Sequence, residues 1–241
     1  MKSSPRLSRT PSRLSDSLHH RLNLYAVAAS AAGMGLLFLG QSAEAKVVYT
    51  PTHKWLPLNQ YFSLDLNHDG INDFKFHLIS FANHSSSSCS LLVRAASQSS
   101  NEIYSTVWER VDLMAAALPK GTKVGPANGF QNQLHEALMF AAGSSVSGNW
   151  SFGPWLDATN PAYLGLRFLI KGEVHYGWAR LGHIRVQTGP GGWCNKPARA
   201  LLTGYAYETI PSKPIITGRT KGPHVVTVEP GSLGALAAGR E

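Results

Sequence analysis

The residues best suited to chemistry lie in one acidic stretch, DLNHDGIND, which covers residues 65–73. Oxygen-bearing side chains occupy its positions 1, 3, 5 and 9, and a glycine occupies position 6. A loop with this spacing can wrap around a hard cation such as Ca²⁺, because glycine permits a sharp turn and the oxygens then face one centre. The predicted ligands are the side chains of Asp65, Asn67, Asp69 and Asp73 and the backbone carbonyl of Ile71.

Two other interpretations of this stretch compete with a strand-flanked calcium loop. A helix–loop–helix calcium site needs a Glu at position 12, where the sequence has Phe76. A hairpin turn rich in Asn, Asp and Gly, without any metal, is the second alternative. Calcium is favoured because closely spaced carboxylates repel one another without a cation. In the calcium geometry, His68 and Asn72 are expected to point outward.

Cys89 and Cys194 are the two cysteines of the chain. An even pair in an exported protein is typical of a disulfide, and a bridge closing about 100 residues contributes up to about 4.7 kcal/mol in the chain-entropy model. Two separately buried thiols are the alternative. A metal or redox role is not expected, because the sequence has no C-x-x-C motif.

Three aromatic residues crowd a short segment that contains Gly and Pro, namely Trp150, Phe152 and Trp155. Aromatic rings on a loop can stack on sugar rings, so Trp150 and Trp155 are candidate ligand-stacking residues. Packing of the same rings against the end of a hydrophobic core is the alternative, and it is the more common one.

No catalytic motif is complete. His135-Glu136 begins like the H-E-x-x-H helix of zinc proteases, but Met139 stands in place of the second His. A glycosidase needs two carboxylates about 5–10 Å apart, and the acidic residues outside the loop sit in no recognisable motif. We therefore expect no enzyme, with a secreted carbohydrate-active hydrolase on a lectin-like sandwich as the alternative.

The segments around these residues predict strands rather than helices. The acidic loop lies between two alternating segments, and Lys171-Gly172 forms a tight turn between two others. We expect an all-β fold, an antiparallel β-sandwich of jelly-roll or lectin-like type with at most one or two short helices. The predicted strands cover residues 47–50, 61–66, 73–79, 91–96, 163–170, 174–181 and 201–208, while 107–118 is strand or short helix and 131–142 is the candidate helix.

Residues 1–45 are predicted to be a signal peptide. A basic leader precedes an apolar run at 22–39, and Ala43-Glu44-Ala45 fits an A-x-A cleavage site. A single transmembrane anchor is the alternative, although the apolar run is marginal for a span of about 20 residues. The predicted domains are this signal peptide, a single β-sandwich at 46–218 and a flexible tail at 219–241, in a secreted, periplasmic or cell-envelope protein.

The charge of the remaining chain is modest and dispersed. Without residues 1–45, Lys and Arg fall from 22 to 17 and Asp and Glu from 14 to 12, so the net charge falls from +8 to +5. Nucleic-acid binding usually requires clustered basic residues or a recognised module, so no nucleic-acid partner is expected. A mild positive charge is compatible with anionic cell-surface polymers.

Three C-terminal segments carry a family resemblance. YLGLRF at 163–168, HYGWARL at 175–181 and GYAYETIP at 204–211 together resemble a module of uncharacterised exported bacterial proteins of the PEP-CTERM surface-sorting type. The tail at 228–239 resembles the start of their sorting signal, but Val228 replaces its first Pro and its apolar segment is short. About six apolar residues cannot span a bilayer, so we expect no stable membrane span after cleavage.

Together these features predict a non-catalytic exported or cell-envelope β-sandwich with a structural Ca²⁺ loop. Its expected partner is an extracellular polysaccharide or another envelope polymer.

Overall fold

A computed structural model describes residues 46–96, 100–108, 112–131, 136–158, 161–189 and 192–228. The predicted signal peptide and residues 229–241 of the sorting-like tail lie outside these ranges. The chain divides after Glu44 into two units, and every described residue belongs to the second.

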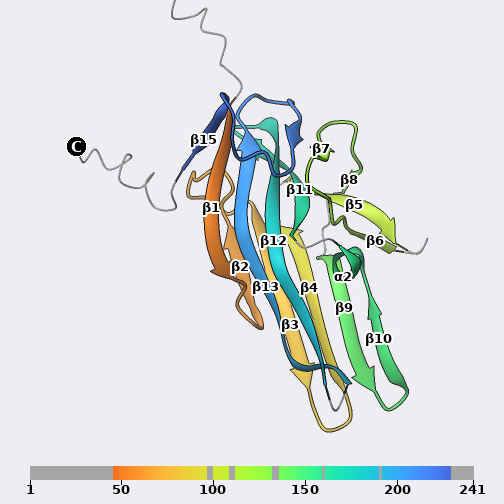
Figure 1. Cartoon of the computed structure of the whole chain (residues 1–241). Coiled ribbons are helices and arrows are strands. Elements are labelled where there is room, and N and C mark those ends of the chain that lie inside the picture. The colour runs from red at the N-terminus through yellow and green to blue at the C-terminus, as the bar shows by residue number, and fades with distance from the viewer. Residues whose placement is uncertain are drawn as a thin grey trace, which may run out of the picture. The chain divides into compact units, whose positions relative to one another are not determined.

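Two sheets form the sandwich that the sequence predicts (Figure 1). Sheet A has the order β15-β1-β13-β12-β11-β5-β6, with β8 also paired to β5, and sheet B has the order β10-β9-β4-β3-β2. The pairs are antiparallel except for β1 and β15, which run parallel. Sheet A contains β1 (Val47–Trp55), β5 (Glu102–Trp108), β6 (Asp112–Ala115), β8 (Phe130–Gln131), β11 (Ala162–Ile170), β12 (Glu173–Gly189), β13 (Gly192–Glu208) and β15 (Val225–Thr227). Sheet B contains β2 (Gln60–Leu64), β3 (Phe74–Ala82), β4 (Ser87–Ala95), β9 (Ala137–Ser145) and β10 (Gly148–Phe152).

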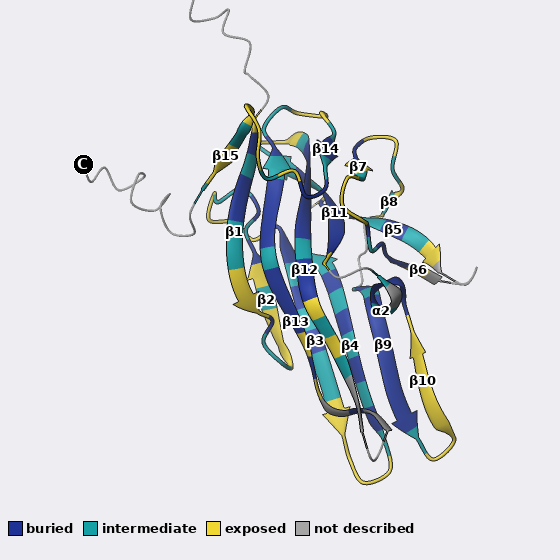
Figure 2. Ribbon diagram, viewed as in Figure 1, coloured by how far each residue is buried: buried dark blue, intermediate teal, exposed yellow. Residues whose placement is uncertain are grey.

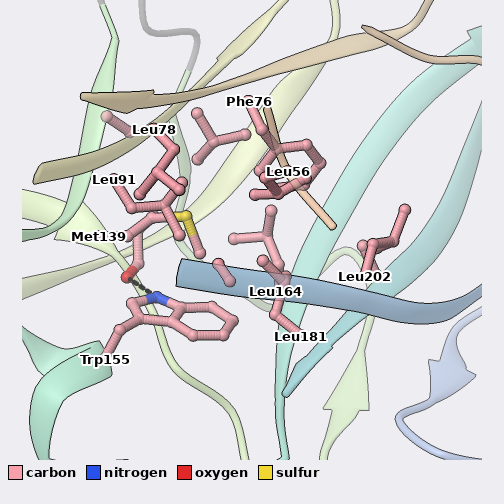
Figure 3. Close-up of a cluster of buried hydrophobic side chains, with 14 of the residues drawn as sticks. Leu56, Phe76, Leu78, Leu91, Met139, Trp155, Leu164, Leu181 and Leu202 are labelled. Atoms are coloured by element: carbon pink, nitrogen blue, oxygen red, sulfur yellow. Dashed lines mark hydrogen bonds between the residues drawn. The ribbon is translucent and has the colours of Figure 1, made fainter. Parts of the chain in front are cut away.

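The main core lies between the sheets and follows the alternation of the strands. Phe74, Phe76 and Leu78 of β3 are buried, while the residues between them are only partly covered. Leu164, Leu166 and Phe168 of β11 are buried in the same core cluster. Figure 3 shows side chains of both sheets meeting in this cluster, including Phe76 and Leu78 from sheet B and Leu164, Leu181 and Leu202 from sheet A.

A second core covers one part of the outer face of sheet A. Buried side chains of its strands, including Tyr163, Tyr176 and Trp178, pack there against Leu118, Val124 and Ile215. Val124 and Ile215 belong to the small two-stranded sheet of β7 (Lys123–Val124) and β14 (Ile215–Ile216). The other part of this outer face has no such cover among the described residues.

The predicted disulfide between Cys89 and Cys194 is confirmed. The two residues have a Cα–Cα distance of 5.7 Å, and both are almost fully buried. Cys89 lies in β4 and Cys194 in β13, so the bridge joins sheet B to sheet A across the main core.

The predicted helix at 131–142 is wrong over its described C-terminal part, because residues 137–145 form β9 between β4 and β10. Helix-forming composition is a weak preference there, and pairing on both sides outweighs it. Residues 102–108 and 112–115 are strands, so the alternative of a helix at 107–118 also fails over the described positions. The described part of the chain has one α-helix, α2 (Pro154–Asp157).

The ordered fold extends beyond residue 218, where we expected the domain to end. Val225–Thr227 form β15 and pair with Val47–Tyr49 of β1. None of the helices within the described ranges has the length and apolar character needed to cross a bilayer.

Candidate functional site

The acidic loop connects β2 to β3 and closes an antiparallel hairpin, as the sequence predicts. Leu64 pairs with Phe74, and the Asp73 N–H donates to the Leu64 carbonyl at 2.9 Å. Leu66 anchors the loop in the main core, where it is fully buried against Gly177 of β12. Gly70 makes the sharp turn with a φ of +87°, which a side chain would strain.

Backbone N–H groups of the loop itself surround the Asp65 and Asp69 carboxylates. Asp65 accepts hydrogen bonds from the N–H groups of His68 at 2.7 Å and Gly70 at 2.8 Å, and a longer one from Asp69 at 3.3 Å. Asp69 accepts one from the Ile71 N–H at 2.8 Å. These are the interactions of a tight Asx-rich turn, and they hold two carboxylates in one small loop.

Asn67 provides the one buried side-chain oxygen of the described loop that has no hydrogen-bond partner. Its Nδ2 donates to Asp69 Oδ2 at 2.9 Å, which fixes the orientation of the amide. Its Oδ1 is buried and has no hydrogen-bond partner. A buried acceptor without a donor is costly, and a cation is a suitable partner for an amide oxygen beside two carboxylates.

Asp73 is buried at the end of the loop that leads into β3. Its Oδ2 accepts from the Leu66 N–H at 2.8 Å and its Oδ1 from Asn101 Nδ2 at 3.3 Å. The pKa of Asp73 is raised to about 6, chiefly by burial and also by the negative charges of Asp65 and Asp69, while its hydrogen bonds from Leu66 and Asn101 oppose the shift. The three carboxylates therefore interact electrostatically, which is the repulsion that a divalent cation would relieve.

Asn101 is a structural residue of this site that sequence reasoning missed. It is buried, donates to the Asp73 carbonyl at 3.2 Å, and accepts the Leu169 N–H at 3.1 Å. It thereby ties the acidic loop to β11. A single Asn far from the loop in sequence carries no pattern from which this contact could be found.

His68 does not point outward, so this expectation is wrong. Its Nε2 lies 2.8 Å from Thr50 Oγ1, and its ring lies 5.6 Å from the ring of Tyr205. A φ of +63° turns the His68 backbone so that the side chain packs against β1 and β13. The loop is thus attached to sheet A as well as to sheet B.

The described residues contain no group of three or more His, Cys, Asp or Glu side chains gathered to hold a metal ion. Three of the predicted ligands, Asp65, Asn67 and Asp69, nevertheless share one turn. Their donor chemistry fits a hard cation, with the buried Asn67 Oδ1 as the group that most needs one. Asp73 uses two of the roughly four acceptor sites of its carboxylate for the protein.

Trp155 is a core residue, so its predicted role in ligand stacking is wrong. It has an exposed fraction of 2%, and its Nε1 donates to the Ala115 carbonyl at 2.9 Å. Figure 3 shows its ring beside Met139 in the main core. The physical reason is the short helix α2, which begins directly after β10 at Gly153 and turns the Trp155 indole inward.

Trp150 has the accessibility that stacking requires. Its exposed fraction is 40%, and its ring lies 5.8 Å from that of Phe152 at an interplanar angle of 30°. Both belong to β10, the edge strand of sheet B, which is exposed along its whole length (Figure 2). A Cβ atom on Gly143 would lie 2.5 Å from the Trp150 ring. The indole therefore rests directly on the glycine that pairs with it in β9.

A polar cluster occupies another part of sheet B. The rings of Tyr61 and His77 lie 4.2 Å apart, Arg94 covers the Tyr61 ring at 4.7 Å, and Glu136 pairs with His77 at 3.5 Å. The pKa of Tyr61 is raised, first by its hydrogen bond to Glu136 and then by burial and the Glu136 charge. This cluster combines one carboxylate, that of Glu136, with the aromatic and basic side chains of Tyr61, His77 and Arg94.

Two further carboxylates also pair with cations. Glu102 pairs with Arg167 at 2.6 Å, and the buried Glu208 pairs with Lys213 at 3.6 Å. Glu136 stands seven residues along the chain from Gly143, the partner of Trp150, which corresponds to about 23 Å of extended strand.

Comparisons with known protein families, with curated proteins and with solved structures give no match. Function is therefore inferred from the described side chains of this chain.

Proposed function

We propose that this chain is an exported, non-catalytic β-sandwich that binds an extracellular polysaccharide through the Trp150–Phe152 surface. The observation that carries the proposal is the indole of Trp150, exposed on an edge strand and resting on Gly143. A ring held in this way presents an apolar surface to solvent at little conformational cost. That is what stacking on the C–H face of a sugar requires.

Binding is favoured over hydrolysis by the positions of the carboxylates. A glycosidase brings two of them to the bond that it cleaves. Glu136 precedes β9 and stands seven residues along the chain from Gly143, the partner of Trp150, and Glu102 and Glu208 are paired with cations elsewhere. Export is supported by the leader sequence and by a disulfide, which persists in oxidising compartments.

The test is a panel of neutral and charged polysaccharides with the purified protein. Retention on at least one neutral glycan is expected, with a loss of about tenfold or more in affinity for Trp150→Ala, since one stacked ring contributes on the order of 1–3 kcal/mol. The matched control is Phe81→Ala, which removes an exposed aromatic ring from β3 of the same sheet. Release of reducing sugar, abolished by a Glu→Gln change, would instead establish the hydrolase alternative.

We also propose that the acidic loop binds Ca²⁺ as a structural ion. Asp65, Asn67, Asp69 and the Ile71 carbonyl would hold it, with Asp73 as the fifth candidate. Extracellular calcium modules have a Kd of about 10⁻⁴–10⁻³ M. At about ten times Kd, the ion adds about 1.4 kcal/mol to the free energy of unfolding.

Calorimetry with and without calcium tests this proposal. For a domain of this size, about 1.4 kcal/mol corresponds to a rise of roughly 3–6 °C in Tm. Asp69→Ala should abolish the rise, whereas Asn72→Ala, an exposed position of the same loop that is not a proposed ligand, should keep it. If calcium leaves the Tm of the unaltered protein unchanged, the loop is a metal-free Asx turn.

A further inference from the structure

The uncovered part of the outer face of sheet A carries a second surface, which is chemically different from the Trp150 surface. We define the cationic strip as Trp55, Arg180, His183, Arg185 and Arg199. These residues come from β1, β12 and β13, beyond the region covered by β7 and β14. Figure 2 shows exposed positions along the ends of β1 and β12.

Alternation in the strands places Arg185 and Arg199 on this outer face. Their neighbours Ile184 and Val186, like Ala198 and Ala200, pack into the core between the sheets. Arg185 and Arg199 are direct cross-strand partners, and both are exposed. Two like charges in this position repel each other, and an anion between them removes that repulsion.

The strand segments that carry the strip contain no acidic residue. The sequence contains no Asp or Glu between Glu173 and Glu208, nor between Lys46 and Leu64. The ion pairs among described residues use Arg94, Arg167, Lys213 and His77, and none involves an arginine of the strip. This excess of positive charge is complementary to a polyanion.

Arg180 is held in place by neutral acceptors. Its Nε donates to Thr203 Oγ1 at 2.7 Å, and its Nη2 donates to the Thr203 carbonyl at 2.8 Å and to the Tyr49 hydroxyl at 3.3 Å. These bonds fix the guanidinium without cancelling its charge. A fixed guanidinium recognises a carboxylate with less loss of side-chain entropy than a mobile one.

Trp55 gives the strip an apolar platform. Its exposed fraction is 49%, and the rings of His53 and His183 lie 6.4 Å and 6.3 Å from it. Both strands are irregular here, between Pro51 and Lys54 in β1 and between Gly182 and Arg185 in β12, and His183 has a φ of +51°. Such bulges redirect side chains and are frequent beside binding sites.

Two hollows are lined by residues of the strip. One, of about 370 Å³, is lined by Trp55, Leu56, Leu58, Pro197, Ala198 and Arg199. The other, of about 300 Å³, contains Arg180 and His183 in its wall. Both volumes lie at the lower end of the range for small-ligand sites, about 300–1,000 Å³. Each hollow therefore combines room for a small group with an arginine, and the first also has an indole.

We propose that the cationic strip binds an acidic polysaccharide, with sugar rings against Trp55 and carboxylates on Arg180, Arg185 and Arg199. A uronic acid carries both an apolar C–H face and a carboxylate, which guanidinium groups bind in bidentate fashion. The repetition of arginine along the strip suits a polymer with a charge on successive units. This proposal does not rest on the Trp150 surface, because the two surfaces belong to different sheets.

The test measures binding of the full chain to polygalacturonate and alginate, with dextran as the neutral polymer and dextran sulfate as a polyanion without carboxylates. Binding to the carboxylated polymers is expected at about 50 mM salt and should weaken as screening increases. Arg185→Gln with Arg199→Gln, and separately Trp55→Ala, should each weaken it on the order of tenfold. Arg199→Lys, which keeps the charge but loses the bidentate geometry, should show a smaller loss.

Two controls keep the result specific. Lys123→Gln with Lys221→Gln removes the same charge at exposed positions outside the strip and should change the affinity less than twofold, while Phe81→Ala, which removes an exposed ring from β3 of sheet B, should leave it unaltered. Equal Tm values establish that the variants are folded. The proposal is overturned by failure to bind either carboxylated polymer, by equal loss in the lysine control, by equal binding of dextran sulfate, or by full retention in Trp55→Ala.

Discussion

Removing the Cys89–Cys194 bridge should cost this fold a large share of its stability. The bridge closes a loop with a sequence separation of 105 residues. In the chain-entropy model, closing a loop of that length lowers the conformational entropy of the unfolded chain and so raises the free energy of the unfolded state by about 4.7 kcal/mol at 25 °C. The whole free energy of unfolding of a domain is commonly about 5–15 kcal/mol, so the loss should be plain in urea unfolding.

The variant that isolates this contribution is Cys89→Ala with Cys194→Ala. Both sites are buried, so Ser would add the cost of an unsatisfied hydroxyl, whereas Ala leaves only a small cavity. We expect the midpoint in urea to fall and the m-value to rise, because the unbridged chain exposes more surface when it unfolds.

A single substitution provides the control for the reasoning. Cys89→Ala already opens the bridge, so it should lose nearly as much stability as the double variant, within about 1 kcal/mol. A loss below about 1 kcal/mol in the double variant, with an unchanged m-value, would refute the argument that the bridge acts by restricting the unfolded chain.

Three further changes have defined outcomes. In calcium-free buffer the pKa of Asp73 is about 6 in the folded state and about 3.9 in the unfolded state, so its contribution to stability is full below pH 4 and is lost as pH rises through 6. The free energy of unfolding, measured from pH 4 to 7, should show this fall relative to the Asp73→Asn variant. Parallel curves for the two proteins would contradict the prediction. Asn101→Ala leaves the partly buried Leu169 N–H without its acceptor and should lower the free energy of unfolding by about 1–3 kcal/mol in urea titration. No change would mean that water replaces the amide. Gly143→Ala places a Cβ 2.6 Å from the Ser87 carbonyl oxygen and 2.5 Å from the Trp150 ring. Calorimetry should show that the free energy of unfolding falls by about 1–3 kcal/mol, and binding to neutral glycans should weaken. An unchanged Tm would show that the Trp150 ring does not rest on Gly143.

The features that local sequence could predict are those in which a short pattern determines the geometry. The hairpin of β11 and β12 follows from alternation around Lys171-Gly172, and both turn residues have positive φ. The loop between β2 and β3 follows in the same way from its glycine and its flanking strands. The disulfide could be predicted because two cysteines allow a single pairing.

The features that failed depend on what lies opposite a residue in the fold. Residues 137–142 have helix-forming composition, but β4 and β10 pair with them from both sides. Trp155 resembles Trp150 in type and position, yet Trp155 belongs to α2 and is buried in the core, whereas Trp150 lies on an edge strand. His68 turns inward because Thr50 and Tyr205 offer it partners from strands that are distant in sequence.

The same dependence on long-range pairing explains why the cationic strip could not be read from the sequence. Its arginines are dispersed over β12 and β13, and no run of basic residues marks them. Register alone brings Arg185 opposite Arg199, and register again places Trp55 opposite Leu201 next to them. Basic residues that are dispersed along the sequence thus become neighbours only after the sheet has formed. In a β-protein, the absence of a run of basic residues in the sequence therefore does not exclude a basic binding surface. The comparison of Trp55→Ala with Trp150→Ala on acidic and neutral glycans tests this reasoning directly, since each surface should lose only its own ligand.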